Sequence, residues 1–129
     1  MQHILILALV FLLTVSAERC NEKKETGDDA AKVYKGRLEI KAICMNYTVK
    51  LLEGNIDTSK IVSSWTDETT KKSYNNVFAL KNPCSFPSTI KQGDEFYFVL
   101  DSIIPPPCAV CMAYYPTPGR KLAIKIVNK

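Results

Sequence analysis

The most informative scarcity in this sequence is that of histidine. His3 is the single histidine among 129 residues, and it lies in the N-terminal apolar stretch. If that stretch is removed as a signal peptide, the mature chain has no histidine, and therefore no Ser–His–Asp or Cys–His catalytic group and no histidine-ligated zinc. Carboxylates alone could still hydrolyse a glycoside, but the pairs at 28–29, 67–68 and 94–95 are sequence neighbours that face opposite sides of a strand. We interpret them as solvated turns, and we predict a protein that is not an enzyme and has no cofactor.

Long apolar runs are also scarce, because only one occurs. Residues 4–15 are almost entirely apolar. Val15 and Ala17 occupy the two small-residue positions that precede a signal-peptidase cleavage site. The pattern predicts a secretory signal peptide over residues 1–17, with an N-terminal anchor helix as the alternative. The remaining residues, 18–129, have the length of one small domain and contain no segment apolar enough to cross a bilayer. We therefore predict a secreted, extracellular protein with no membrane span.

Cysteine is present in an odd number. The five residues are Cys20, Cys44, Cys84, Cys108 and Cys111. In an oxidising compartment most of them should form disulfides, with one left free, buried or bonded to another chain. The C-x-x-C pair follows three prolines in a strand-like stretch, whereas a redox site needs a helix N-terminus and a zinc site needs further cysteines or histidines. Positions three apart on a strand face opposite sides, so we expect the pair to be structural and to bond separate partners.

Alternating and β-branched segments predict an all-β fold. In residues 33–43 the apolar side chains share one parity and the charged ones the other, as in a half-buried strand. Further strands are predicted over residues 46–55, 77–80, 95–104, 108–115 and 120–127, with part of 57–76 as a strand edge. Short strands separated by turns indicate a small antiparallel barrel or sandwich. The aromatic residues expected in its core are Tyr34, Phe78, Phe96, Phe98 and Tyr114, and those expected outside are Tyr97 and Tyr115.

Two surface features are candidates for modification or binding. Asn46 begins the sequence Asn-Tyr-Thr, an acceptor for N-glycosylation, so we expect a glycoprotein with this side chain facing solvent. Lys35, Arg37 and Lys41 alternate along one predicted strand and would form a basic patch for a glycosaminoglycan or an acidic protein. An ordinary solvated face is the alternative. The formal net charge of +4 is too small to imply nucleic acid.

The order of these segments resembles the netrin-like module. That module occurs in tissue inhibitors of metalloproteinases, netrins, procollagen C-proteinase enhancers and the C-terminal domains of complement components three to five. The resemblance rests on Cys20, then "VYKGRLEIKAI", then "NNVFALKNPCSFPSTIKQGDEFYFVLDS" and "CAVCMAYY", and it covers residues 20 to about 115. It implies a small OB-like, five-stranded antiparallel barrel with disulfide staples.

The resemblance also implies a function. We expect an extracellular module that binds another protein or a matrix component, and the alternative is an inhibitor of secreted metalloproteinases. The inhibitory members begin their mature chain with a cysteine whose amine and carbonyl chelate the protease's zinc, whereas cleavage after Ala17 places Cys20 two residues inside the chain. We expect Cys20 to bond Cys84, one cysteine of the C-x-x-C pair to bond Cys44, and the fifth cysteine to stay unpaired.

Overall fold

The computed structural model describes residues 31–103, 106 and 108–129. The predicted signal peptide, residues 1–17, and Cys20 lie outside the described residues. Within them the chain is all-β apart from two short 3₁₀ turns, Ile43–Met45 and Pro83–Ser85. The strands are β1 (Tyr34–Lys41), β2 (Tyr47–Glu53), β3 (Val62–Thr66), β4 (Ser73–Leu80), β5 (Glu95–Leu100), β6 (Lys121–Leu122) and β7 (Ile124–Val127). The predicted all-β class is confirmed.

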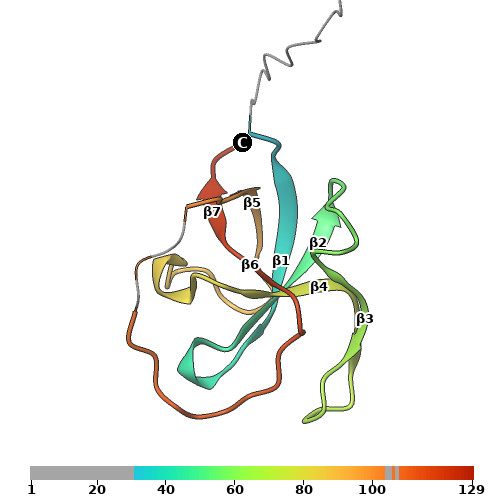
Figure 1. Ribbon diagram of the computed structural model, residues 1–129, viewed down its shortest axis with the longest axis vertical. Coiled ribbons are helices and arrows are strands. Elements are labelled where there is room, and N and C mark those ends of the chain that lie inside the picture. Colours follow the sequence, from blue (N-terminus) through green and yellow to red (C-terminus); the bar gives the residue numbers. More distant parts are fainter. Residues whose placement is uncertain (1–30, 104–105, 107) are drawn as a thin grey trace, which may run out of the picture.

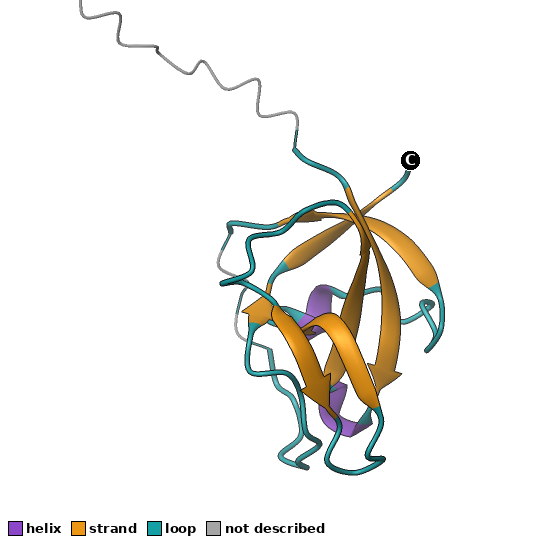
Figure 2. Cartoon of the chain, turned by 90° about the vertical axis from the view of Figure 1, so that its right-hand side faces the viewer, coloured by secondary structure: helices purple, strands orange, loops and turns teal. Residues whose placement is uncertain are grey.

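The strands form one strongly curved sheet around β1, as the two views in Figure 1 and Figure 2 show. β1 pairs antiparallel with β2 on one side and with β5 on the other. The hydrogen-bonded order is β3-β4-β2-β1-β5-β7, and β6 pairs with β4 away from this path. All the pairings along the path are antiparallel, and the two pairs that are consecutive in sequence, β1–β2 and β3–β4, are joined by short turns.

The last two strands contact different parts of the sheet. β6 pairs in parallel with the end of β4, where the Ala79 N–H donates to the Arg120 carbonyl at 2.8 Å and the Lys81 N–H to the Leu122 carbonyl at 2.9 Å. After Ala123 the chain continues as β7, which pairs antiparallel with β5. The continuous strand order still ends at β3 and β7, so the seven-stranded sheet is not closed into a barrel along that order.

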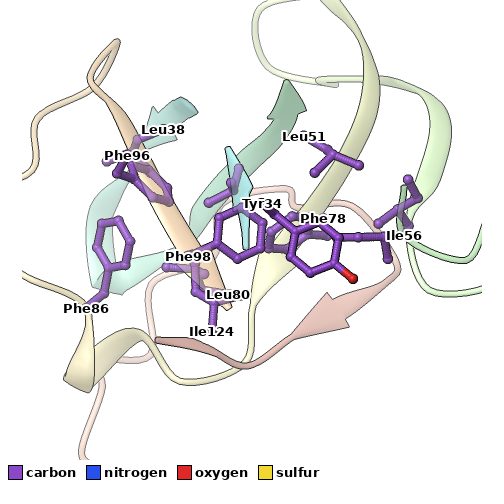
Figure 3. Packing of buried hydrophobic residues seen from close by; sticks show 12 residues of the cluster. Tyr34, Leu38, Leu51, Ile56, Phe78, Leu80, Phe86, Phe96, Phe98 and Ile124 are labelled. Carbon is purple, nitrogen blue, oxygen red and sulfur yellow. The ribbon is translucent and has the colours of Figure 1, made fainter. Parts of the chain in front are cut away.

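An aromatic core fills the concave side of the sheet (Figure 3). The ring centroid of Phe98 lies 5.5 Å from that of Tyr34, 5.9 Å from that of Phe78 and 6.0 Å from that of Phe96. All four rings are buried, as predicted from their parity in the sequence. Burial of one such side chain contributes roughly 1.5–3 kcal/mol, so this cluster is a main source of the fold's stability.

One predicted strand is wrong. Residues 108–115 form no strand, and the chain from 108 to 120 is a loop that runs around one end of the molecule (Figure 1). We call residues 108–120 the tethered loop. Cys108 and Cys111 within it are bonded to the turns Pro83–Ser85 and Ile43–Met45 rather than lying beside a strand. Apolar composition alone therefore led to the wrong prediction.

Candidate functional site

Two disulfides attach the tethered loop to the rest of the fold. Cys108 bonds Cys84 in the turn after β4, with a Cα–Cα distance of 6.1 Å. Cys111 bonds Cys44 in the turn between β1 and β2, with a Cα–Cα distance of 5.0 Å. The prediction that the C-x-x-C cysteines have separate partners, one of them Cys44, is confirmed. The predicted Cys20–Cys84 bond is wrong, because the turn at Pro83–Ser85 meets the start of the tethered loop.

The turn that holds Cys44 has an unusual backbone. Cys44 and Met45 both have positive φ, 57° and 58°. The left-handed region costs a residue with a Cβ roughly 1–2 kcal/mol, and such outliers gather where geometry serves a function. The turn leaves Ile43 and Met45 exposed on either side of the disulfide. The local strain therefore accompanies an apolar surface rather than a buried contact.

Five exposed apolar side chains belong to this region. Four of them are the sequence neighbours of Cys44 and Cys111, and the fifth lies further along the tethered loop. Their exposed fractions are 60% for Ile43, 38% for Met45, 46% for Val110, 99% for Met112 and 81% for Tyr114. We call these five residues the apolar ridge. Tyr114 was predicted in the core, and its exposure is a correction that follows from the missing strand at 108–115.

A pocket of about 510 Å³ lies between the two disulfides. Both disulfides contribute to its lining, as do the ridge residues Met45 and Val110. Leu80 and Pro83 add apolar surface, and the polar part of the lining includes Lys81, Lys121 and Asn82. We call this the disulfide pocket. Its volume falls in the range of small-ligand or side-chain pockets, and its lining combines apolar and polar groups.

A second hollow of about 430 Å³ shares two of these lysines. Lys81 and Lys121 also line it, together with Lys60, Asp101 and Ile103. We call it the basic pocket, and we call Lys60, Lys81 and Lys121 the basic trio. Neither the trio nor the ridge was predicted from the sequence. A usable signal for the ridge was present, since an apolar residue stands on each side of both Cys44 and Cys111.

A buried carboxylate attaches the far end of the tethered loop. Asp67, at the β3–β4 turn, is fully buried and accepts hydrogen bonds from the Thr69 N–H, the Thr70 hydroxyl and the Tyr115 hydroxyl, each at 2.8 Å. Burial by itself would raise the pKa of Asp67, but the hydrogen bonds outweigh it and lower that pKa. The same contact raises the pKa of Tyr115. The predictions that Asp67 is solvated and Tyr115 exposed are therefore wrong.

The predicted glycosylation residue is part of the same attachment. The Asn46 side-chain nitrogen donates to the Ile43 carbonyl at 2.8 Å and to the Ala113 carbonyl at 3.1 Å. Thr48, the third residue of the acceptor sequence, is fully buried. A glycan replaces one of the two amide hydrogens, so a glycosylated Asn46 would lose one of these bonds. Glycosylation of Asn46 stays a prediction, and the observed role of this side chain is to hold the tethered loop.

The predicted basic residues of β1 are engaged within the fold. Lys35 lies 2.7 Å from a Glu95 carboxylate oxygen and 3.6 Å from one of Glu53, and its hydrogen bond with Glu95 raises the Lys35 pKa. Arg37 pairs with Glu39 at 2.7 Å. Lys41 donates to the carbonyls of Ser88 and Ile90 at 3.0 and 2.7 Å. These contacts engage all three residues within the fold, and the basic patch on this strand stays a prediction.

Within residues 31–103, 106 and 108–129 the structure contains no cluster of three or more metal-ligating side chains. No helix in that part of the chain is long and apolar enough to cross a membrane. Comparison of the chain with protein-family models, with curated proteins and with solved structures finds no match. The geometry of the ridge and the two pockets therefore carries the functional argument.

Proposed function

We propose that this chain is an extracellular, disulfide-stapled domain that acts by binding another protein through the apolar ridge and the disulfide pocket. The observation that carries the proposal is the exposure of five apolar side chains around one disulfide. An apolar surface of this kind is unfavourable in water unless a partner covers it. The disulfides hold the surface in place before binding, which reduces the entropy lost on association.

We further propose that the domain has the OB-like barrel topology that the netrin-like resemblance implies. The support is a circuit of pairings that runs from β1 to β2, β4 and β6, and from β7 through β5 back to β1. Ala123 alone separates β6 from β7, so the two act as one bent fifth strand. In this arrangement β3 extends β4 as a hairpin outside the barrel.

The extracellular location has two supports. Disulfides persist mainly in oxidising compartments, and the described part of the chain contains two. The predicted signal peptide is the second. For the alternative, metalloproteinase inhibition, the argument against is the predicted cleavage after Ala17, which leaves Cys20 two residues inside the mature chain and so without the terminal amine that would chelate the zinc. Titration of a secreted metalloproteinase tests this alternative directly, and we expect no stoichiometric inhibition.

The experiment that tests the binding proposal is site-specific photo-crosslinking of the full secreted chain. A benzophenone amino acid replaces Met112, the most exposed ridge residue, and the protein is added to conditioned medium. The captured protein is then purified and its affinity measured for the wild type and for a Met112→Ser, Tyr114→Ser variant. Loss of two interface anchors should weaken binding by at least about tenfold.

The matched control is Val33→Ser. Val33 is 48% exposed but lies outside the ridge and outside both pockets, so loss of its apolar surface should leave affinity within about twofold. The proposal fails if the ridge variant binds like the wild type, or if both variants lose affinity equally. Crosslinking without this difference between variants gives no support.

A further inference from the structure

Lys60, Lys81 and Lys121, the basic trio, line one pocket, and none of them makes an ion pair among the described residues. The structure has ion pairs from Lys35 and Arg37, but none from Lys60, Lys81 or Lys121 among the residues it describes. The three side chains are exposed and line one concave pocket. One acid, Asp101, also lines it, and its carboxylate accepts the Ile103 N–H at 2.9 Å. Three positive charges thus meet in a hollow with little neutralisation.

The sheet pairing brings two of these lysines together. Lys121 begins β6 opposite Ala79 on β4, and Lys81 follows β4 with its N–H bonded to the Leu122 carbonyl. The parallel pairing therefore brings residues 40 positions apart into one pocket, with Lys81 two positions beyond the register partner of Lys121. Because like charges raise each other's free energy, an arrangement of this kind is expected where an anionic ligand compensates it.

The basic pocket adjoins the disulfide pocket through the same two residues. Lys81 and Lys121 line both hollows, so cations stand directly beside an apolar wall that includes Leu80, Pro83 and Val110. A ligand that fills both must carry negative charge next to bulky apolar groups. A polypeptide segment supplies both kinds of group, whereas a sulfated glycan supplies charge alone and would leave the apolar pocket unfilled.

We infer that the two pockets together bind an acidic segment of the partner protein in which Asp or Glu side chains stand next to a bulky apolar residue. The apolar side chain enters the disulfide pocket, and the carboxylates contact the basic trio. This inference rests on the proposed function, because it names the chemistry of the partner that the ridge contacts. It predicts association that weakens with salt, since exposed charge pairs are screened at high ionic strength.

Selection from a library of random dodecapeptides displayed on phage tests the inference. The full secreted protein, with its disulfides intact, is immobilised and the enriched peptides are synthesised. Their affinities are measured for the wild type and for a trio variant, Lys60→Gln, Lys81→Gln, Lys121→Gln. The matched control is Lys71→Gln, Lys72→Gln, Lys91→Gln, which removes the same charge from the β3–β4 turn and the β4–β5 connection. Equal melting temperatures establish that both variants fold.

We expect enriched peptides that combine Asp or Glu with a bulky apolar residue. Their affinity should fall at least about tenfold in the trio variant and no more than about twofold in the control. The inference is overturned if the enriched peptides lack acidic residues or bind the trio variant equally well. It is also overturned if no peptide is enriched, or if trio-dependent binding is found for heparin alone.

The two proposals fail in different ways. Peptides that depend on Met112 and Tyr114 but not on the trio would leave the binding function standing and remove the acidic partner. The binding function itself would be removed if peptide binding depended neither on Met112 and Tyr114 nor on the trio, and if the ridge and control variants bound the crosslinked protein equally well.

Discussion

Asn82 gives the sharpest test of how the last strand is held. Its side chain is buried between the end of β4 and the start of β7. The side-chain oxygen accepts the Ile124 N–H at 3.1 Å, and the side-chain nitrogen donates to the Ile124 carbonyl at 2.9 Å. The same nitrogen lies 2.8 Å from the Ser85 hydroxyl. One amide side chain therefore continues the ladder where the β4–β6 pairing ends.

Replacement of Asn82 by Ala should destabilise the protein by about 2 to 6 kcal/mol. The change leaves the N–H and the carbonyl of buried Ile124 without their partners, and each unsatisfied buried group costs about 1–3 kcal/mol. The lower end applies if water enters from the shallow hollow that Asn82 and Ile124 both line. Asn82→Asp, which keeps the shape, should also destabilise, because its carboxylate would face the Ile124 carbonyl.

The measurement is urea unfolding of the oxidised protein, followed by the fluorescence of its single tryptophan, Trp65. We expect a lower midpoint with an unchanged slope. Asn75→Ala, at an exposed position of β4, is the control and should change the free energy of unfolding by no more than about 0.5 kcal/mol. A loss below about 1 kcal/mol for Asn82→Ala would show that the Ile124 groups find other partners, and the reasoning would be refuted.

Three further predictions concern the Asp67 hydrogen bonds, the β4–β6 pairing and the two disulfides. Asp67→Asn should destabilise by about 1.5–3 kcal/mol near neutral pH, as expected for hydrogen bonds to a charged group. Because the folded-state pKa of Asp67 is lowered, the stability that its carboxylate contributes is present above the unfolded pKa of about 3.9 and is lost as pH falls. A difference in free energy of unfolding between wild type and variant that stays constant down to pH 2 would contradict this. The Ala79 and Lys81 amides, which donate to β6, should exchange with solvent as slowly as the core amides of β1, and rapid exchange at both would argue against a barrel held by β6. Serine replacement of both cysteines should destabilise by about 3 kcal/mol for the Cys84–Cys108 bridge and by about 4 kcal/mol for the Cys44–Cys111 bridge, because the second closes 67 residues rather than 24; denaturant unfolding of each pair checks the order.

Much of the sheet could be predicted because local periodicity carries the information. In β1, Tyr34, Leu38 and Ile40 are buried and the intervening charged residues are partly exposed, as their alternation indicates. The aromatic run of β5 places Phe96 and Phe98 inward for the same reason. A strand needs only one apolar face against a core, so its pattern is visible without knowledge of its neighbours.

The candidate site could not be predicted in this way. Residues 108–115 have strand-like composition, yet two disulfides and the Asn46 and Tyr115 hydrogen bonds hold them as a loop. Because these residues form no strand, the alternation of side-chain direction along a strand does not apply to them. Tyr114 is exposed, and the Tyr115 hydroxyl donates to Asp67. Burial of Asp67 likewise depends on a partner 48 residues away.

The sequence by itself determined the all-β class, the inward face of the central strands and the structural use of the C-x-x-C cysteines. These are properties of single segments and of side-chain direction along a strand. The tertiary structure decided which cysteines bond, which cations are paired and which apolar residues are left exposed. Each of those outcomes depends on the distance between segments that are remote in sequence, and only the folded sheet brings Lys81 and Lys121 into one pocket and Cys44 beside Cys111.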